Sequence, residues 1–259
     1  MLMPRLQRPT RQLERLRHCR FAHRGLHNSS IPENSLPAFR LAARVGLGVE
    51  LDVRMTRDRQ LVVVHDSNLK RLCGVGVRVE KSTWEQLQQL RLLGTEERIP
   101  LLDEVLPILS GRSPAIIEVK TDRGNGRSLC RLLCKRLESY RGLFCLESFD
   151  PRVLRWLRGQ LAQGARRKGT KTPLPIRWLM STLVSNFYGK PDFVAYRQED
   201  RQRKLGLWLC RRLYQLPEFS WTITSQESLE TAESDGRTGI FEGFLPSRRT
   251  AGAEREAHV

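Results

Sequence analysis

The chain lacks several features that would place it in a specialised class of protein. Its six cysteines include no Cys-x-x-Cys pair, which argues against a zinc knuckle or zinc ribbon. No apolar stretch approaches the ~20 residues that a transmembrane helix needs, and there is no internal repeat or low-complexity tract. At 259 residues the chain can bury a core without disulfide staples. Scattered cysteines and a basic N-terminus without an apolar leader segment lead us to expect a cytoplasmic protein.

Acidic residues are in the minority, because 28 Asp and Glu oppose 45 Lys and Arg and leave a formal net charge of +17. The excess is regional, with +5 in residues 1–20 and +12 in residues 152–212. In the second region basic residues are interleaved with apolar ones, which is typical of solvated helix faces. We therefore favour a basic surface and expect no nucleic acid as a partner. Attraction of anionic substrates and weak contact with an anionic membrane surface stay open.

Strand-like apolar runs alternate with helical patterns between residues 20 and 246. Strands are expected at 20–23, 48–54, 61–65, 114–119, 143–147, 176–180, 192–195, 220–223 and 239–241. Helices are expected at 34–45, 82–92, 102–109, 127–139, 151–161, 198–214 and 226–234. This alternation predicts a mainly parallel sheet with helices outside. We expect residues 1–19 to form a basic arm and residues 247–259 a disordered tail.

One pair of strands breaks the alternation. The turn between 48–54 and 61–65 is too short for a crossover helix, so these strands should pair antiparallel. With a four-residue turn, Thr56 faces Leu61 and Asp52 lies opposite His65. Setting the hairpin strand aside leaves eight strands. The predicted fold is therefore an α/β (β/α)8 TIM barrel, with a β-hairpin after the second strand and a small capping insertion at 66–98.

Three carboxylates fall on strand-like segments whose remaining residues are mostly apolar. Glu50 and Asp52 are two residues apart and share one strand face, while Glu118 lies in an interior strand. Carboxylates held close together repel unless a cation lies between them, and hard oxygen ligands favour Mg²⁺, Ca²⁺ or Mn²⁺. Ordinary exposed strand charges are the alternative for the first two. For Glu118, Lys120 or an arginine is an alternative partner.

Two histidines lie at the ends of apolar strands, near the acidic residues. His23 closes the first strand and His65 closes the third. Because imidazole titrates near neutral pH, one ring can accept a proton while the other donates one. Arg24 has a guanidinium suited to a phosphate, with a structural salt bridge to Glu33 as the alternative. Lys120 adds a point charge.

Eight short motifs, in order, carry a resemblance to a known family. They are His23-Arg24-Gly25, Pro32-Glu33-Asn34-Ser35, Glu50-Leu51-Asp52-Val53, Val63-Val64-His65-Asp66, Ile99 to Leu106, Ile117-Glu118-Val119-Lys120, Leu146 to Asp150 and Trp221 to Thr224. Throughout residues 20–246 the chain resembles the glycerophosphodiester phosphodiesterase family. The resemblance implies a TIM barrel related to the phosphatidylinositol phospholipase C barrels. It also implies a hydrolase of lipid and glycerol metabolism that converts glycerophosphodiesters to sn-glycerol 3-phosphate and an alcohol.

The resemblance also implies roles for the acidic residues and the histidines. Glu50, Asp52 and Glu118 match residues that bind one divalent cation, Mg²⁺ or Ca²⁺. His23 and His65 match the acid/base pair. A metal withdraws charge from phosphoryl oxygens, and the histidines move protons to and from the reacting oxygens.

Four further positions are implied to contact the substrate. Arg24 and Lys120 fall at phosphate-contacting positions, and Phe149 and Trp221 match aromatic residues that line the pocket. Residues 239–246 depart from the Ile-Ile-Thr-Asp-x-Pro run common in the family, so the resemblance assigns no role to Glu242. Two other functions stay open: a lysophospholipase D-type enzyme acting at a membrane surface, and a non-catalytic basic binding protein. The oligomeric state is not predicted.

Overall fold

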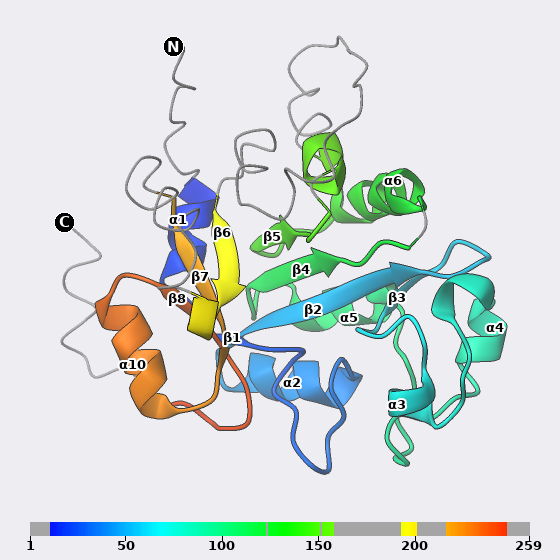
Figure 1. The fold of residues 1–259 in the computed structure, drawn as a ribbon, viewed down its shortest axis with the longest axis horizontal. Coiled ribbons are helices and arrows are strands. Elements are labelled where there is room, and N and C mark those ends of the chain that lie inside the picture. The colour runs from blue at the N-terminus through cyan, green and yellow to red at the C-terminus, as the bar shows by residue number, and fades with distance from the viewer. Residues whose placement is uncertain (1–10, 123, 151, 158–192, 201–215, 248–259) are drawn as a thin grey trace, which may run out of the picture.

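The computed structural model describes residues 11–247, apart from residues 123 and 151 and the segments 158–192 and 201–215. Its strands form one curled sheet in the order β5-β4-β2-β1-β8-β7-β6, and β3 joins the edge of β2 (Figure 1). Neighbouring strands along this order are parallel. The strands are β1 (Phe21–Ala22), β2 (Gly48–Met55), β3 (Leu61–Val63), β4 (Ala115–Val119), β5 (Phe144–Glu147), β6 (Val194–Arg197), β7 (Glu218–Ile223) and β8 (Thr238–Phe241).

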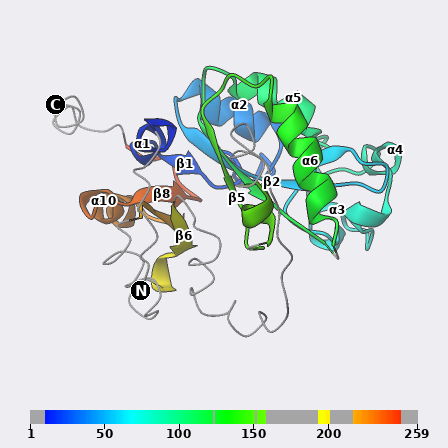
Figure 2. The same cartoon turned by 90° about the horizontal axis from the view of Figure 1, so that it is seen from above.

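Helices cover the outer face of this sheet, as the alternating pattern of the sequence predicts. Figure 2 shows α2, α5 and α6 outside the part formed by β1, β2 and β5, and α10 beside β8. The main helices are α1 (Arg11–Arg17), α2 (Leu36–Arg44), α5 (Leu102–Leu109), α6 (Gly126–Leu137) and α10 (Gln226–Ser234). The shorter ones are α3 (Lys70–Cys73), η1 (Val79–Lys81), α4 (Trp84–Leu87) and η2 (Gln198–Asp200). The result is a TIM-barrel-like α/β fold.

Side-chain alternation along the strands separates an outer core from the interior of the sheet. In β2, Val49, Leu51 and Val53 belong to the large apolar cluster that includes residues of α2, α5 and α6. The residues between them, Glu50 and Asp52, therefore point to the concave side, because successive strand residues face opposite ways. The same rule applies in β4, whose register places Glu118 beside Asp52 and Ile116 beside Glu50.

The amino ends of the strands enclose a separate apolar cluster. Phe21, Ile116, Phe219 and Ile240 come from four different strands and are buried together. Helix α1 contributes Leu13 and Leu16 to this cluster, three residues apart and so on one face of the helix. This end of the concave side is thus filled with apolar side chains, and the charged residues lie toward the carboxyl ends of the strands.

The hairpin formed by β2 and β3 has a different register from the predicted one. Strand β3 pairs antiparallel with β2, and Leu61 lies opposite Met55 rather than Thr56. Thr56 and Gln60 bond to each other, which leaves only residues 57–59 in the turn. Arg59 has a φ of 65°, a left-handed conformation that shortens the turn. The predicted opposition of Asp52 and His65 is therefore wrong, and the amide of Val64 donates to the carbonyl of Asp52 instead.

Residues 66–98 form a small unit with its own apolar cluster, packed on one face of β3. Val62 and Val64 turn toward this unit, while Leu61 and Val63 face the main core. The long helix predicted at 82–92 is wrong, because regular α-helix is limited to Trp84–Leu87. The unit contributes Leu69, Leu72, Val79, Leu87 and Leu92 to this cluster, and Ile99, the residue after the unit, also belongs to it.

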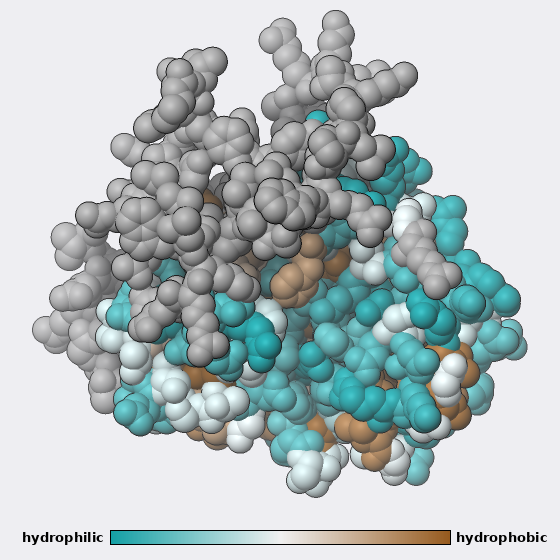
Figure 3. All heavy atoms as spheres, in the orientation of Figure 1, coloured by the Kyte–Doolittle hydropathy of each residue, from teal (hydrophilic) through white to brown (hydrophobic). Residues whose placement is uncertain are grey.

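Several predictions fall outside the described residues. They are the strand at 176–180, the end of the helix at 151–161, most of the helix at 198–214, and most of the basic region 152–212. Residues 152–157 of the first of these helices are described and are helical. Within the described part, the face seen in Figure 3 is mostly hydrophilic, with small hydrophobic areas. No helix in this part has the length and apolar character that crossing a membrane requires. The division into arm, barrel and tail stays a prediction.

Candidate active site

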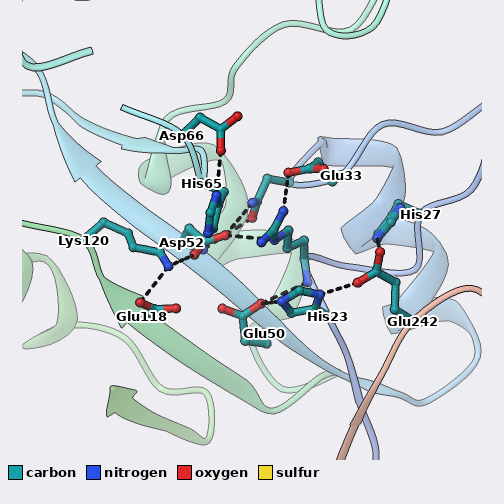
Figure 4. Close-up of polar contacts among 12 residues, drawn as sticks. His23, His27, Glu33, Glu50, Asp52, His65, Asp66, Glu118, Lys120 and Glu242 are labelled. Atoms are coloured by element: carbon teal, nitrogen blue, oxygen red, sulfur yellow. Dashed lines mark hydrogen bonds and ion pairs between the residues drawn. The ribbon is translucent and has the colours of Figure 1, made fainter. Parts of the chain in front are cut away.

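Three buried carboxylates converge on the concave side, near the carboxyl ends of β2 and β4. Glu50, Asp52 and Glu118 each offer an oxygen, and these oxygens lie within 4.8 Å of one another. Figure 4 shows all three side chains turned toward a common point. The arrangement follows from strand geometry, because Glu50 and Asp52 share a face of β2 and Glu118 is in register with Asp52.

The electrostatics of this cluster suit a cation. Burial, followed by the nearby charges of Asp52 and Glu118, raises the pKa of Glu50 well above its ordinary value. Burial and the charge of Asp52 also raise the pKa of Glu118. Glu147 of β5 lies in register with Glu118, and burial and that charge raise its pKa to about 8. The cluster therefore holds more negative charge than its surroundings neutralise, and its donors are the hard oxygens that Mg²⁺ and Ca²⁺ prefer.

Lys120 supplies part of the missing positive charge. Its Nζ lies 2.7 Å from a carboxylate oxygen of Glu118 and 3.2 Å from one of Asp52. Burial would lower the pKa of Lys120, but these two carboxylates hold it above its ordinary value. Burial acts to raise the pKa of Asp52, yet Lys120, His65 and Arg24 together keep it low. Lys120 is thus a partner of the carboxylates as well as a candidate phosphate contact.

His23 lies directly after β1, on one side of the acidic cluster. Its Nδ1 is 2.5 Å from a carboxylate oxygen of Glu242, and its Nε2 is 3.9 Å from Glu50 (Figure 4). Its backbone amide donates to the carbonyl of Phe241, the last residue of β8. The ring is therefore oriented by the strand next to its own, with Nε2 toward the carboxylates.

His65 lies on another side of the cluster, beyond the end of β3. Its Nδ1 is 2.7 Å from an oxygen of Asp66, which leaves Nε2 as the remaining ring nitrogen. The buried Arg54 donates from Nε to the backbone carbonyl of His65 and from Nη1 to Glu80, which fixes the main chain there. Burial lowers the pKa of His65, against the charge of Asp52. A neutral ring near neutral pH suits proton transfer.

Arg24 forms the salt bridge to Glu33 that the sequence analysis gave as an alternative to phosphate contact. Its Nη1 donates to Glu33 at 2.8 Å, and its Nε lies 3.6 Å from Asp52. Its backbone amide donates to Glu50 at 3.0 Å. The guanidinium is thus placed against the acidic cluster whether or not it also contacts a phosphate.

Gly25 lets this loop approach helix α2 closely. Its φ is +82°, and a Cβ there would come within 2.9 Å of the Cβ of Ala38. A side chain would force the segment carrying His23 and Arg24 away from the helix, so glycine is required for its position.

Two aromatic rings meet at the edge of the site. Phe149 and Trp221 pack edge to face with centroids 5.9 Å apart, and the Nζ of Lys120 lies 5.7 Å from the centroid of Phe149. Phe149 is 64% exposed, so its ring is accessible from solvent at the edge of the site. The structure thus brings together all nine residues singled out in the sequence.

Two further residues of the site were not predicted from the sequence. Asn34 is buried, has a φ of 54° and donates from Nδ2 to Asp52 at 2.8 Å. Glu242 bonds to His23 and also lies 3.6 Å from Nε2 of His27. Asn34 sits within a motif already noted, whereas the only sequence signal for Glu242 is its place immediately after the last strand. Strand-end carboxylates gather at one edge of a parallel barrel.

Comparison with known proteins agrees with this geometry. The sequence model of the "Glycerophosphoryl diester phosphodiesterase family" matches residues 23–167, more than half of the chain. A glycerophosphodiester phosphodiesterase of Bacillus altitudinis is 38% identical over 107 residues, which cover 39% of this chain and 43% of that protein. Lysophospholipase D GDPD1 of Rattus norvegicus is 34% identical over 125 residues, covering 43% and 39%. The chain thus aligns with about two-fifths of the length of these curated relatives.

Solved structures share the fold over most of the chain. A glycerophosphodiester phosphodiesterase from Thermotoga maritima has a TM-score of 0.65 at 25% identity and covers 87% of this chain and 94% of its own. An Oleispira antarctica phosphodiesterase, solved with the product sn-glycerol-3-phosphate, has a TM-score of 0.68 at 21% identity, covering 86% and 91%. Sequence, fold and the arrangement of acidic residues agree: the chain belongs to the glycerophosphoryl diester phosphodiesterase family.

Proposed function

We propose that the chain hydrolyses glycerophosphodiesters to sn-glycerol 3-phosphate and an alcohol, with a divalent cation as cofactor. The observation that carries this proposal is the position of His23 and His65 on different sides of one acidic cluster. We place the substrate phosphate over this cluster, so that each ring can serve one of the two reacting oxygens. The family of the chain supports the same reaction.

In this proposal Glu50, Asp52 and Glu118 hold the cation. When bound, the cation supplies positive charge to the phosphoryl oxygens. Arg24 and Lys120 stabilise the negative charge that develops there, from their positions beside Asp52. Asn34 keeps Asp52 oriented through its amide.

The histidines move the protons. One ring takes the proton of the glycerol 2-hydroxyl as its oxygen bonds to phosphorus, and the other gives a proton to the oxygen of the departing alcohol as its phosphorus–oxygen bond breaks. Water then opens the resulting cyclic phosphate to sn-glycerol 3-phosphate, and in this step the second ring takes a proton from the water while the first returns its proton to the 2-oxygen. Glu242 and Asp66 hold the two rings by Nδ1, which directs both Nε2 atoms to the substrate side. Such carboxylate–imidazole pairs fix the tautomer of the ring and its orientation.

The test is release of sn-glycerol 3-phosphate from glycerophosphocholine or glycerophosphoethanolamine, with Mg²⁺ or Ca²⁺ and with EDTA. We expect EDTA to abolish turnover and His23→Ala to lower kcat/KM at least about 100-fold, the typical worth of a general acid or base. His18→Ala is the matched control. His18 is exposed and directly follows α1, the helix that packs on the apolar layer at the amino ends of the strands. Full activity in His23→Ala, or an equal loss in His18→Ala, contradicts the assigned role.

A second candidate function is hydrolysis of lysophospholipids. The exposed ring of Phe149 beside Lys120 offers an apolar contact at the rim of the site, and some relatives carry the name lysophospholipase D. The comparison that decides is turnover of lysophosphatidylcholine in anionic vesicles against turnover of glycerophosphocholine in solution. A vesicle advantage that Phe149→Ser removes supports this function, and no advantage rules against it.

A further inference from the structure

Arg71 of the 66–98 insertion joins two carboxylates that belong to the rim of the site. Its Nη1 and Nη2 each donate to Glu33 at 2.8 Å, as a fork on both carboxylate oxygens. Its Nε donates to Asp66 at 2.7 Å. All three nitrogens of one guanidinium are therefore engaged in charged hydrogen bonds, the strong and directional kind.

Each of these carboxylates also binds a residue of the proposed machinery. Glu33 accepts from Nη1 of Arg24 at 2.8 Å, and Asp66 lies 2.7 Å from Nδ1 of His65. The result is a continuous chain of polar contacts, Arg24–Glu33–Arg71–Asp66–His65, in which two arginines alternate with two carboxylates. The labelled Glu33, His65 and Asp66 of this chain lie together in Figure 4. Its first and last members come from segments 41 positions apart in the sequence.

The charges of this chain are held in place by their neighbours. Burial acts to raise the pKa of Glu33, but the bonds from Arg71 and the charge of Arg24 keep it below its ordinary value. Burial likewise opposes the charge on Asp66, and the bonds from Arg71 and His65 lower its pKa. Both carboxylates thus stay ionised, and two arginines share one buried Glu33.

We propose that Arg71 is a positioning residue, which fixes the His65 ring and the Arg24 guanidinium relative to each other through Asp66 and Glu33. The insertion then contributes to the geometry of catalysis and does more than cover the site. This inference rests on the proposed function, because it gives Arg71 a purpose only if His65 and Arg24 act on a substrate.

The competing explanation is that Arg71 merely fastens the insertion to the barrel. Arg98 provides the comparison, since it belongs to the same insertion and also forms a fork, with Nη1 and Nη2 on Glu104 of α5 at 3.0 and 2.5 Å. The Arg71 side chain is 48% exposed and that of Arg98 is 36% exposed, so neither substitution opens a core cavity. Glu104 contacts neither histidine of the site among the described residues.

The kinetic experiment compares Arg71→Gln, Arg71→Lys and Arg98→Gln with the wild-type chain on glycerophosphocholine and Mg²⁺. We expect kcat to fall about 10- to 100-fold in Arg71→Gln, as when outer partners of active-site groups are removed. Arg71→Lys should recover only part of this loss, because an ammonium lacks the planar fork. Arg98→Gln should keep kcat within about twofold, since substitutions away from such contacts have small effects. Equal losses in the Gln variants of Arg71 and Arg98, or wild-type kcat in Arg71→Gln, overturn the inference.

A second measurement keeps this inference separate from the proposed function. Imidazole ¹⁵N spectra of histidine-labelled protein at about pH 8, above the ordinary histidine pKa of about 6.5, report the tautomer of each neutral ring. His65→Asn identifies the His65 signals among the five histidines. We expect Nδ1-protonated His65 in the wild type and in Arg98→Gln, and a shift toward mixed tautomers in both variants of Arg71.

The two readouts fail in different ways. If the wild-type chain has no hydrolase activity but the Arg71 variants show the tautomer shift, the proposed function is wrong and Arg71 is still the residue that orients His65. An active wild type whose His65 signals are the same in all variants overturns the role of Arg71. Arg71→Lys guards against a folding defect, because it retains the charge that Glu33 and Asp66 face.

Discussion

The two ends of the sheet's concave side are built from the same strands but contain opposite chemistry. At the amino ends Phe21, Ile116, Phe219 and Ile240 pack as an apolar layer. At the carboxyl ends, two residues further along β4, Glu118 meets the acidic residues of β2 and β5. Alternate residues of a strand face the same side, so Ile116 and Glu118 both point to the concave side. The first belongs to the apolar layer and the second to the acidic cluster.

The difference separates residues expected to serve stability from residues proposed to serve function. Burying an apolar ring is favourable by itself, whereas burying several carboxylates together is unfavourable unless a cation compensates them. The apolar layer is thus expected to contribute to the free energy of unfolding, and the acidic layer to detract from it. The following substitutions test this contrast, from the largest expected effect to the smallest.

Phe219→Ala should lower the free energy of unfolding by about 3–5 kcal/mol, because it removes a fully buried ring from a packed layer. Chemical denaturation monitored by circular dichroism gives the value. The exposed Phe149 is the control ring, and Phe149→Ala should change stability by less than about 0.5 kcal/mol. Similar losses in the two variants would mean that the amino-end layer is not a core.

Glu118→Gln should have the reverse profile. It removes a carboxylate that repels Asp52, so metal-free stability should stay the same or rise. Hydrolysis should fall at least about 100-fold, because Glu118 is a proposed cation ligand. The exposed Glu138→Gln is the control for a general change of charge. A strongly destabilised but active Glu118→Gln would reverse the assignment of the two layers.

The stability of the metal-free protein should depend on pH through the acidic layer. Burial and Glu118 raise the folded-state pKa of Glu147 to about 8, above its ordinary value of 4.5. The folded state then holds the proton of Glu147 more tightly than the unfolded state. The contribution of this group to the free energy of unfolding is therefore complete below about pH 4.5 and is lost as the pH rises toward about 8. Urea titrations in EDTA at several pH values should show falling stability across this window. Glu147→Gln should reduce the dependence of the free energy of unfolding on pH. An unchanged dependence would mean that a group other than Glu147 is responsible for it.

Phe149→Ala should have the smallest effect on catalysis. The ring contacts Trp221 and the ammonium of Lys120 at an exposed position, where such a cation–π contact is worth about 0.5–1 kcal/mol. We expect KM for glycerophosphocholine to rise about two- to fivefold, by the conversion of about 1.4 kcal/mol per factor of ten, with kcat unchanged. Steady-state kinetics measure both constants. A fall in kcat would mean instead that the ring positions Lys120.

Much of this contrast was predictable from the sequence, because it depends on local patterns. Alternation of apolar and acidic residues in 48–54 places Glu50 and Asp52 on one strand face, and Glu118 stands out as the single carboxylate of the apolar run 114–119. The hairpin register was not predictable, since it depends on the conformation of Arg59 and the bond between Thr56 and Gln60. A shift of one residue there changes the partner of every position on β3.

Contacts between distant segments were also beyond the sequence. Glu242 and His23 are 219 positions apart, and nothing near either residue indicates that they meet. Arg71 resembles any basic residue of a polar loop until the structure places Glu33 and Asp66 around it. Leu13 and Leu16 lie among arginines, which hid their contribution to the apolar layer.

The meeting of the first and last strands has a consequence for how the protein is made. His23 takes its amide partner from Phe241 and its ring partner from Glu242, so the earliest imidazole of the barrel depends on the latest strand. During synthesis the ribosome must deliver nearly the whole polypeptide before this ring acquires its orientation. Nascent chains that end before residue 238 therefore lack both groups that orient His23.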